Sequence, residues 1–479
     1  FNDTYRVRDN LTLDLGLRYE RWYARHNMRD ATSTWDPRLQ KVVAAVGSDG
    51  KINMNAFLTT PNVAAATAGQ WVTAREAGYN DGLTEGNGNW APRLGIVYRP
   101  FRDKQIVLRG GYGLFYNSFT GNRSASSAAN LPFWGVESLG YGLSQLQSWQ
   151  TVWSSDPNAF GIFGMGEAVD PRIKAARTHN WNMTLQTALP WKSALTLSYV
   201  GTKVANDVIM MPYNAAAIGP HSNLQADRPN PGISSVTRME NYSRYWYHAL
   251  QTKAERRFAD GFLFTLSYSF SRSMGGPFGG SDEYGSLIPF SPDWYNRGRT
   301  DFDIRHIEYA TVVWEMPVGK GRRYLSDTNR AVDAILGGWE VGFTQQARSG
   351  LPLSVSGGYS NLGNSYGTRA DIVGSPSISD PTTRKWFNTA AFARPALYTF
   401  GNSSMGIVEG PGLLQFNTVL SKRFRVTEGK DFQFRWEAFN AFNNVNYNNP
   451  STNIASSNFG RITGAGTARY MQFALKFNF

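Results

Sequence analysis

The 479-residue sequence has no cysteine, few charged residues and no long apolar run. The absence of cysteine excludes disulfides, thiolate metal ligands and cysteine nucleophiles. Charged residues make up 18% of the chain. No stretch reaches the ~18 consecutive apolar residues that a membrane-spanning helix requires. A spanning β-strand is not excluded by that count, because only every second residue of such a strand contacts lipid.

Basic residues outnumber acidic ones, with 48 Lys and Arg against 36 Asp and Glu and a formal net charge of +12. Such an excess suits nucleic acid or an anionic surface. The Lys and Arg residues are scattered along the chain, however, and no RNA-recognition, zinc-finger or helix-turn-helix pattern is present. The sequence therefore argues against nucleic acid as a partner.

The apolar residues that are present alternate with polar ones in many short segments. The sequence LTLDLGLRYE, residues 11–20, places four leucines and Tyr19 on one side of an extended chain, with Asp14, Arg18 and Glu20 on the other. A helix would spread these residues around its circumference. The same pattern recurs in residues 181–189, 262–270, 431–439 and 471–479. These segments are predicted to be β-strands with one apolar and one polar face.

Weaker alternation brings the total to about twelve predicted strands of roughly ten residues, the length that a tilted strand needs to cross a bilayer. The additional segments are residues 92–99, 106–116, 194–201, 247–258, 304–316, 338–348 and 412–424. Short connections (6–10, 100–105, 190–193, 259–261, 425–430) alternate with long ones (22–90, 117–177, 202–246, 271–303, 349–411, 443–467). This spacing predicts an all-β fold, an antiparallel up-and-down transmembrane β-barrel with long extracellular loops.

The polar side of these strands is predicted to line the lumen. Charged residues such as Asp14, Arg18 and Lys253 lie opposite the apolar side, and a charge facing lipid near the midplane costs several kcal/mol. Aromatic residues near the strand ends are predicted to form the interfacial girdles: Tyr19, Trp22, Tyr116, Trp181, Trp314 and Trp339. The longer connection 318–338 contains AVDAIL, which favours one or two helical turns.

Three segments and the five histidines are candidates for chemistry, and none carries a strong signal. GNSYG, residues 363–367, matches the nucleophile-elbow pattern of hydrolases but lacks the flanking strand and helix. The five histidines and the acidic stretch 279–285 fall at no metal-ligand spacing. RTDFDIRH, residues 299–306, favours a buried ion-pair network over a ligand site. The sequence therefore predicts no enzyme, no cofactor and no metal site.

Aromatic residues in two segments are the candidate ligand-binding residues. One set lies in the long connection 117–177, and the other lies in NYSRYWYHAL, residues 241–250. Exposed aromatic rings beside an arginine can stack on sugar rings or on an aromatic siderophore. They can equally fold the loops onto one another or lie at the lipid interface, and that structural role is favoured. The selected residues are Trp134, Tyr141, Trp149, Trp153, Tyr242, Arg244, Tyr245 and Trp246.

Taken in order, these segments resemble the barrel portion of TonB-dependent outer-membrane receptors of the Oar-like type. The similar stretches include TYRVRDNLTLDLGLRYE, WAPRLGIVYRPF, YHALQTKAERRFADGFLFTLSYSFSRS, GGWEVGFTQQARSGLPLSV, FRWEAFNAFNNVNYNNP and ARYMQFALKFNF, and the resemblance covers nearly the whole chain. It implies a barrel of roughly 22 strands around a plug. It also implies import of a scarce nutrient across the outer membrane of a Gram-negative cell, with energy supplied through TonB.

Residues 1–479 are accordingly interpreted as the C-terminal part of such a barrel, beginning with the end of one further strand in FNDTYRV. The family's plug and N-terminal domain have no counterpart in this sequence. The resemblance implies four partners: outer-membrane lipid, the barrel-assembly machinery, TonB through the absent N-terminal parts, and an unidentified extracellular ligand. It also implies that the last strand, with Phe473, Phe477 and Phe479, carries the assembly signal.

Two other functions fit parts of the pattern. A surface or adhesion barrel without active import would share the same strands, and an upstream TonB-contacting segment and plug would distinguish the receptor from it. A soluble β-propeller acting on glycans would show repeats of about 40 to 50 residues, and the sequence has no such period.

Overall fold

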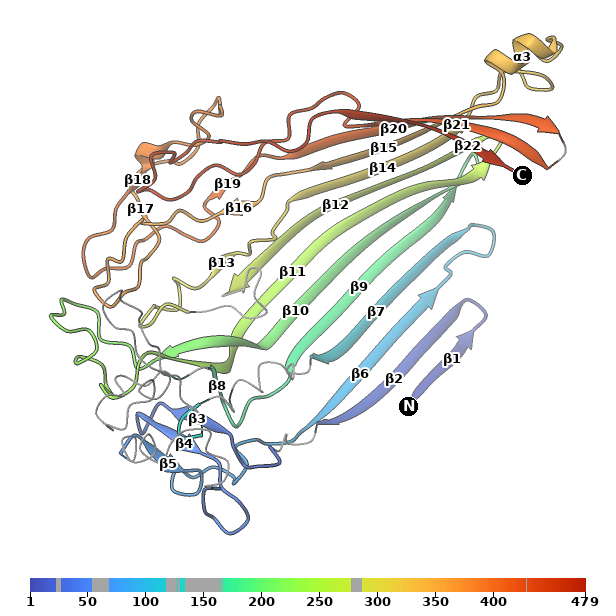
Figure 1. Cartoon of the computed structure of the whole chain (residues 1–479). Coiled ribbons are helices and arrows are strands. Elements are labelled where there is room, and N and C mark those ends of the chain that lie inside the picture. Colours follow the sequence, from blue (N-terminus) through green and yellow to red (C-terminus); the bar gives the residue numbers. More distant parts are fainter. Residues whose placement is uncertain are drawn as a thin grey trace.

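The computed structural model describes residues 1–22, 27–53, 69–117, 127, 130–133, 165, 167–276, 287–427 and 429–479. Its main feature is one sheet of 15 strands, to which β8 (Glu167–Val169) and β13 (Gly298–Arg299) attach at the side. The other thirteen strands lie side by side in chain order, and the sheet curves (Figure 1). No helix in the described part of the chain is long and apolar enough to cross a membrane.

We call these thirteen strands the wall, and each pairs antiparallel with the next. They are β1 (Asn2–Arg8), β2 (Leu11–Trp22), β6 (Asn87–Tyr98), β7 (Ile106–Asn117), β9 (Ala176–Leu189), β10 (Ser193–Tyr213), β11 (Val236–Ala259), β12 (Phe262–Gly276), β14 (His306–Glu315), β15 (Trp339–Arg348), β20 (Leu413–Thr427), β21 (Lys430–Phe439) and β22 (Tyr470–Asn478). Every predicted strand is present, and FNDTYRV contributes β1.

The connections alternate in length as predicted. Short hairpins such as residues 190–192 and 260–261 lie at one end of the wall, and the long connections gather at the other end (Figure 1). The helix α3 (Arg330–Leu336) lies at the hairpin end, where AVDAIL predicted helical turns.

One pair of strands is longer than predicted. β10 and β11 remain paired as far as Tyr213 and Val236, whereas residues 202–246 were expected to form a loop. The register shifts between Val204 and Val208, where an irregularity interrupts the alternation of side chains. Beyond this bulge the strand continues, but its alternation of side chains is shifted relative to the first part. The continuation was therefore not recognised in the sequence.

The register joins the apolar sides of neighbouring strands into continuous rows. Residues directly opposite each other in an antiparallel pair share a face. One row runs through Tyr5, Leu13, Ile96, Gly110, Met183, Tyr199, Leu250 and Phe270. Another runs through Phe262, Trp314, Val341, Leu420, Trp436 and Phe473. We call this side of the wall the outward face.

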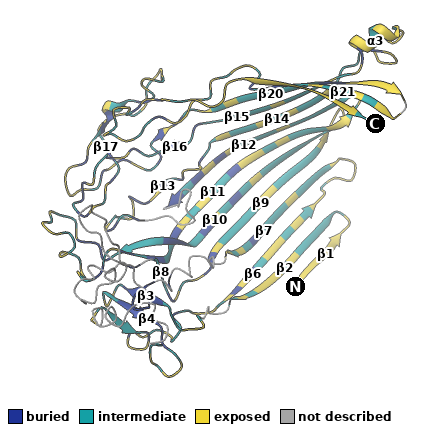
Figure 2. Cartoon of the chain, in the orientation of Figure 1, coloured by how far each residue is buried: buried dark blue, intermediate teal, exposed yellow. Residues whose placement is uncertain are grey.

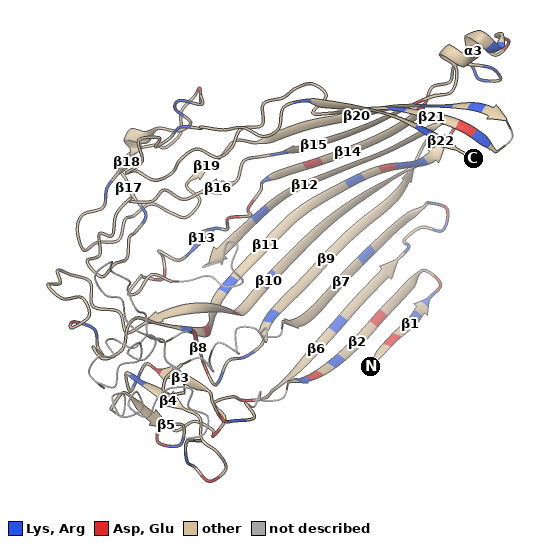
Figure 3. Ribbon diagram, viewed as in Figure 1, with Lys and Arg blue, Asp and Glu red and all other residues tan. Residues whose placement is uncertain are grey.

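The opposite side, the inward face, carries most of the polar residues, although Glu308 lies on the outward face opposite Tyr268 and Ala347. A row from β2 to β12 contains Thr12, Val97, Arg109, Thr184, Ser198, Gln251 and Ser269. Charged residues on this face form ion pairs two positions apart along a strand, and Figure 3 shows how such charges are distributed over the strands. These pairs are Arg18 with Glu20 at 2.7 Å, Lys253 with Glu255 at 2.6 Å, and Arg435 with Glu437.

Aromatic residues occupy the ends of the outward face as predicted, with one exception. Tyr19 contacts Trp90 with ring centroids 4.7 Å apart. Trp22 lies three positions beyond Tyr19 on the same strand and therefore shares the inward face with Glu20. The prediction of Trp22 as a girdle residue is wrong.

Most of the fully buried apolar side chains lie in the long connections, which we call the loop cap. One cluster surrounds Trp35 and Leu131, and another surrounds Phe387 and Phe392. Short strands organise these clusters: β3 (Ser33–Asp36), β4 (Lys41–Ala44), β5 (Trp71–Thr73), β16 (Pro352–Leu353), β17 (Asp371–Ile372), β18 (Phe392–Ala393) and β19 (Val408–Glu409). The wall is intermediate or exposed along most of its length (Figure 2). None of Leu13, Phe264, Phe434, Phe473 and Phe477 is buried.

Candidate functional site

The predicted ligand-binding residues do not form one cluster. Trp134, Tyr141, Trp149 and Trp153 lie outside the described residues. The other four lie near the loop end of β11, where the strand alternation separates them. Arg244 and Trp246 are opposite Gly276 and Met274 on the outward face, whereas Tyr245 faces the other way and contacts Phe302 with ring centroids 6.5 Å apart. The segment therefore contributes to two surfaces.

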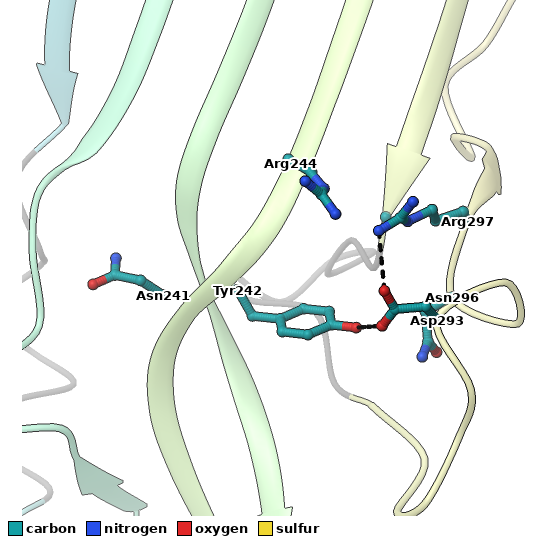
Figure 4. Close-up of a pocket in the computed structure, with 7 residues that line it drawn as sticks. Asn241, Tyr242, Arg244, Asp293, Asn296 and Arg297 are labelled. Atoms are coloured by element: carbon teal, nitrogen blue, oxygen red, sulfur yellow. Dashed lines mark hydrogen bonds and ion pairs between the residues drawn. The ribbon is translucent and has the colours of Figure 1, made fainter.

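Tyr242 and Arg244 line a cavity of about 250 Å³ between β11 and the connection that follows β12 (Figure 4). The Tyr242 hydroxyl donates to Asp293 Oδ1 at 2.9 Å, and Arg297 donates to Asp293 Oδ2 at 3.2 Å. The side chain of Asn241 points away from this group (Figure 4). The cavity thus combines one neutralised carboxylate with the guanidinium of Arg244, an arrangement suited to an anionic or hydroxyl-rich ligand.

Asp293 and Arg297 were missed by sequence reasoning. They lie about 50 residues beyond Tyr242 in a connection with no periodic pattern, so only the fold brings them together. Asp293 and Arg297 are four residues apart, a spacing at which an ion pair can form. Such a pair is usually a solvated surface contact, so the spacing did not indicate a site.

A second cavity, of about 320 Å³, lies inside the loop cap. Its lining includes Tyr295, Ser354, Thr368, Arg369 and Met405. The Arg369 guanidinium lies 3.6 Å from the centre of the Tyr295 ring and donates to the backbone oxygens of Tyr295 and Ser403, at 2.6 and 2.8 Å. Burial lowers the pKa of Arg369, but an arginine starts so high that it stays charged. Its hydrogen bonds to two backbone oxygens indicate that Arg369 stabilises the loop cap.

The segment RTDFDIRH forms the buried ion-pair network that the sequence predicted. Asp303 is 1% exposed. It accepts from Arg299 at 2.7 Å and from the backbone N–H of Ser273 at 2.6 Å, and Arg305 lies 3.6 Å away. Arg299 also approaches Glu409 at 3.5 Å. These contacts attach the connection to the end of β12.

The remaining sequence motifs show no catalytic geometry. GNSYG lies in the connection between β16 and β17, where Gly363 and Ser365 have φ values of +80° and +71°, so it is a turn and not a strand-to-helix elbow. The acidic stretch 279–285 lies outside the described residues. Within the part of the chain that the structure describes, no group of three or more His, Asp or Glu residues is placed to hold a metal ion.

Comparison with known proteins identifies a family. The profile described as outer membrane beta barrel domain matches residues 1–472. None of the curated proteins matches the chain. Similar solved structures include the FrpB iron transporter from Neisseria meningitidis, F3-3 variant (11% identity, TM-score 0.43, covering 99% of this chain and 44% of that chain).

Two further similar structures are an import receptor and a transporter by their names. The ferric-catecholate import receptor Fiu from K12 E. coli is 12% identical, with a TM-score of 0.42, and the match covers 100% of this chain and 43% of that one. The copper transporter OprC is 11% identical, with a TM-score of 0.40, and the match covers 99% of this chain and 46% of that one. The chain therefore spans less than half the length of these proteins.

The profile match covers nearly the whole wall and loop cap, and it agrees with the all-β, antiparallel sheet and its two-sided register. The wall accordingly lies in the outer membrane of a Gram-negative cell. The chain belongs to the outer membrane beta barrel domain family.

Proposed function

We propose that the chain is the C-terminal part of the barrel of a TonB-dependent receptor of the Oar-like type. Such a receptor binds a scarce nutrient outside the cell and imports it by plug-gated transport, without catalysis. The observation that carries the proposal is the two-sided wall, whose polar rows continue from strand to strand opposite the apolar rows. A sheet with this division suits the wall of a wide lumen.

The strand count adds a geometric argument. Within the described chain, β1 pairs with β2 alone and β22 with β21 alone. In a wall of thirteen alternating strands, β1 and β22 run in the same direction, so they cannot pair antiparallel with each other. Unpaired edges in lipid cost several kcal/mol for each backbone group. An odd number of further strands would close the barrel, and about nine would give the roughly 22 strands of plugged transporters.

The plug, TonB and the assembly machinery are parts of this proposal. Force transmitted from the inner membrane through TonB would rearrange the plug and release the bound nutrient into the lumen. Ligand contacts would come from the loop cap, through the cavity at Tyr242 and through the predicted residues Trp134, Tyr141, Trp149 and Trp153. Recognition by the assembly machinery would use Phe473, Phe477 and Phe479, which are 72%, 44% and 93% exposed.

Growth under nutrient limitation tests the proposal. A strain lacking the gene is expected to show a growth defect on at least one limiting source among iron, copper, a vitamin and an oligosaccharide. A TonB-deficient strain carrying the gene should show the same defect. Re-expression of the full-length protein should restore growth only when its TonB-contacting segment is intact.

The alternative function predicts a different result. A surface or adhesion barrel would leave growth unchanged on every source and would reduce attachment of cells to a surface. Restoration of growth by a protein without any TonB-contacting segment would also contradict active import.

A further inference from the structure

The loop end of the outward face carries basic residues in rows of cross-strand neighbours that contain no carboxylate. Three rows of cross-strand neighbours lie between the apolar row through Met183 and the loop cap. The row next to the apolar row contains Tyr112, Trp181, Gly201, His248 and Arg272. The middle row contains Leu114, His179, Lys203, Trp246 and Met274. The row nearest the loop cap contains Tyr116, Arg177 and Ala205, and Arg244 lies there opposite Gly276. The carboxylates of these five strands, Asp207, Glu240 and Glu255, lie outside the three rows.

Four cations of these rows form no ion pair within the described chain, and Asp293, which lines the same cavity as Arg244, is paired with Arg297. Arg177, Lys203, Arg244 and Arg272 are exposed, and none forms an ion pair or a hydrogen bond with a described residue. Three cations of the inward face, Arg18, Lys253 and Arg435, instead pair with a glutamate of their own strand. We call Arg177, Lys203, Arg244 and Arg272 the basic belt. Adjacent unpaired cations repel one another, so binding of an external anion would stabilise the belt.

Two histidines, His179 and His248, lie in the belt rows, and His306 lies opposite Phe270 in the adjoining apolar row; all three make the same contact. In each case a tyrosine hydroxyl bonds Nδ1 of a histidine on the neighbouring strand, one row nearer the loop cap. The pairs are Tyr112 with His179 (2.9 Å), Tyr199 with His248 (2.7 Å) and Tyr268 with His306 (2.7 Å). When the hydroxyl donates to Nδ1, the ring proton lies on Nε2, which remains as a hydrogen-bond donor. The repetition across β7 to β14 indicates a common environment.

The height of the belt corresponds to the outer leaflet's headgroups. The hairpin at Trp191 and Lys192 marks the opposite end of the wall, and Trp191 is 84% exposed. The roughly nine residues from Lys192 to Gly201 extend ~30 Å along the strand and ~23 Å across a membrane at a tilt of ~40°. An apolar band of such barrels is about 25 Å tall. The belt therefore begins where the hydrocarbon ends.

We propose that the basic belt binds the phosphate groups of anionic glycolipids in the outer leaflet. Guanidinium and ammonium groups are the side chains that pair with phosphate oxygens, Arg with two parallel hydrogen bonds and Lys as a point charge. The interleaved Trp181, Trp246 and Tyr116 rings suit the boundary between sugar and acyl chain. This role concerns the outer surface of the barrel; Arg244 is shared with the cavity at Tyr242, whereas Arg177, Lys203 and Arg272 do not line that cavity.

Lipid binding by the full-length protein in detergent tests the belt. The probes are lipid A with both phosphates and the same lipid A after enzymatic dephosphorylation, each titrated in ammonium acetate and followed by native mass spectrometry. The wild-type protein is expected to bind the phosphorylated form at least about tenfold more tightly. Equal affinity for the two lipids would overturn the proposal, and this measurement requires no variant to fold.

Three matched variants locate the site. Combining Arg177→Gln, Lys203→Gln, Arg244→Gln and Arg272→Gln should remove the preference for phosphate. Combining Lys320→Gln, Arg322→Gln, Arg323→Gln and Arg330→Gln removes the same charge at the hairpin end and should preserve it. Exchanging Arg and Lys at the four belt positions keeps the charge, and most of the preference should remain. An unchanged preference in the first variant, folded by heat-modifiable gel migration, would contradict the assignment.

Discussion

The wall and the loop cap place their apolar side chains in opposite ways. In the cap, Trp35, Leu131 and Leu362 are completely buried and Phe387 is 3% exposed. In the wall, Leu266, Phe270 and Phe473 are 40%, 46% and 72% exposed, although they are just as apolar. The cap thus resembles a water-soluble domain with small dry cores. The wall has an apolar surface without protein to cover it.

This difference shows that the two regions are built for different solvents. Burying apolar surface away from water stabilises the cap, with about 25 cal/mol for each Å² removed. The wall obtains the same benefit only when lipid covers its outward face, because its own strands leave those side chains exposed. Its backbone groups are satisfied by the cross-strand hydrogen bonds, as spanning strands require.

Removing a large side chain from the cap should have the largest effect. Phe387 packs against Phe392 and Phe459, with ring centroids 5.7 and 5.3 Å away. Phe387→Ala should destabilise the cap by about 3–5 kcal/mol through the cavity it leaves. Limited proteolysis should cut residues 349–411 at lower denaturant concentration, while heat-modifiable migration of the barrel stays unchanged. The matched control is Phe473→Ala, which should leave proteolysis of the cap as in the wild type. Equal sensitivity of the cap to protease in both variants would contradict the proposed difference between cap and wall.

A charge placed on the wall should have a somewhat smaller effect, and the effect should depend on the face. Leu266 and Ser267 are neighbours near the middle of β12 that point to opposite faces. Leu266→Arg should cost about 2–4 kcal/mol of folding free energy in vesicles, because the arginine meets lipid near the midplane. Ser267→Arg should cost less than about 1 kcal/mol, since it enters the polar side. Urea titration of folding into vesicles measures both, and similar costs would contradict the assignment of faces.

The smallest effect is expected from the protonation of His221 in the connection between β10 and β11. Its Nδ1 lies 2.8 Å from Asp227 Oδ2 and its Nε2 lies 2.8 Å from the Ala217 carbonyl oxygen. The Ala217 carbonyl and the Asp227 carboxylate raise the pKa of His221 above its ordinary value of 6.5. The protonated ring therefore stabilises this connection below the ordinary value, and the stabilisation is lost as pH rises through the raised pKa.

Hydrogen exchange of residues 214–235 measures this dependence. After correction for intrinsic rates, protection should be greater at about pH 6 than at about pH 8. His221→Gln should show the same protection at both values. A wild-type connection that becomes more protected as pH rises would contradict the sign of the shift.

The strands of the wall could be predicted from the sequence because each strand has one face toward lipid and one toward water, so apolar and polar residues alternate along it. Residues 11–20 and 262–270 alternate cleanly, and both form strands in which that alternation separates the two faces. The extension of β10 and β11 was missed because the bulge at Val204 to Val208 shifts the phase of the pattern. The sequence shows which residues alternate, but it does not show where the pairing register between two strands shifts.

The loop cap and its cavity were less predictable for a different reason. Strands of two to four residues, such as β3 and β16, are too short to show periodicity. The Tyr242–Asp293 hydrogen bond joins residues 51 positions apart, and no local rule specifies that contact. The aromatic segment 241–250 was recognised, but its alternation divides Trp246 from Tyr245, so an apparent cluster becomes two surfaces.

The exposure of alternate β12 residues to lipid tests the central claim most directly. The chain has no native cysteine, so single cysteines can be placed at positions 264 to 269 and labelled with an environment-sensitive fluorophore. With the full-length protein folded into vesicles, brominated lipid should quench the label at positions 264, 266 and 268, and an aqueous quencher should act at 265, 267 and 269. Quenching by lipid at the odd positions, or no alternation along the strand, would contradict the account.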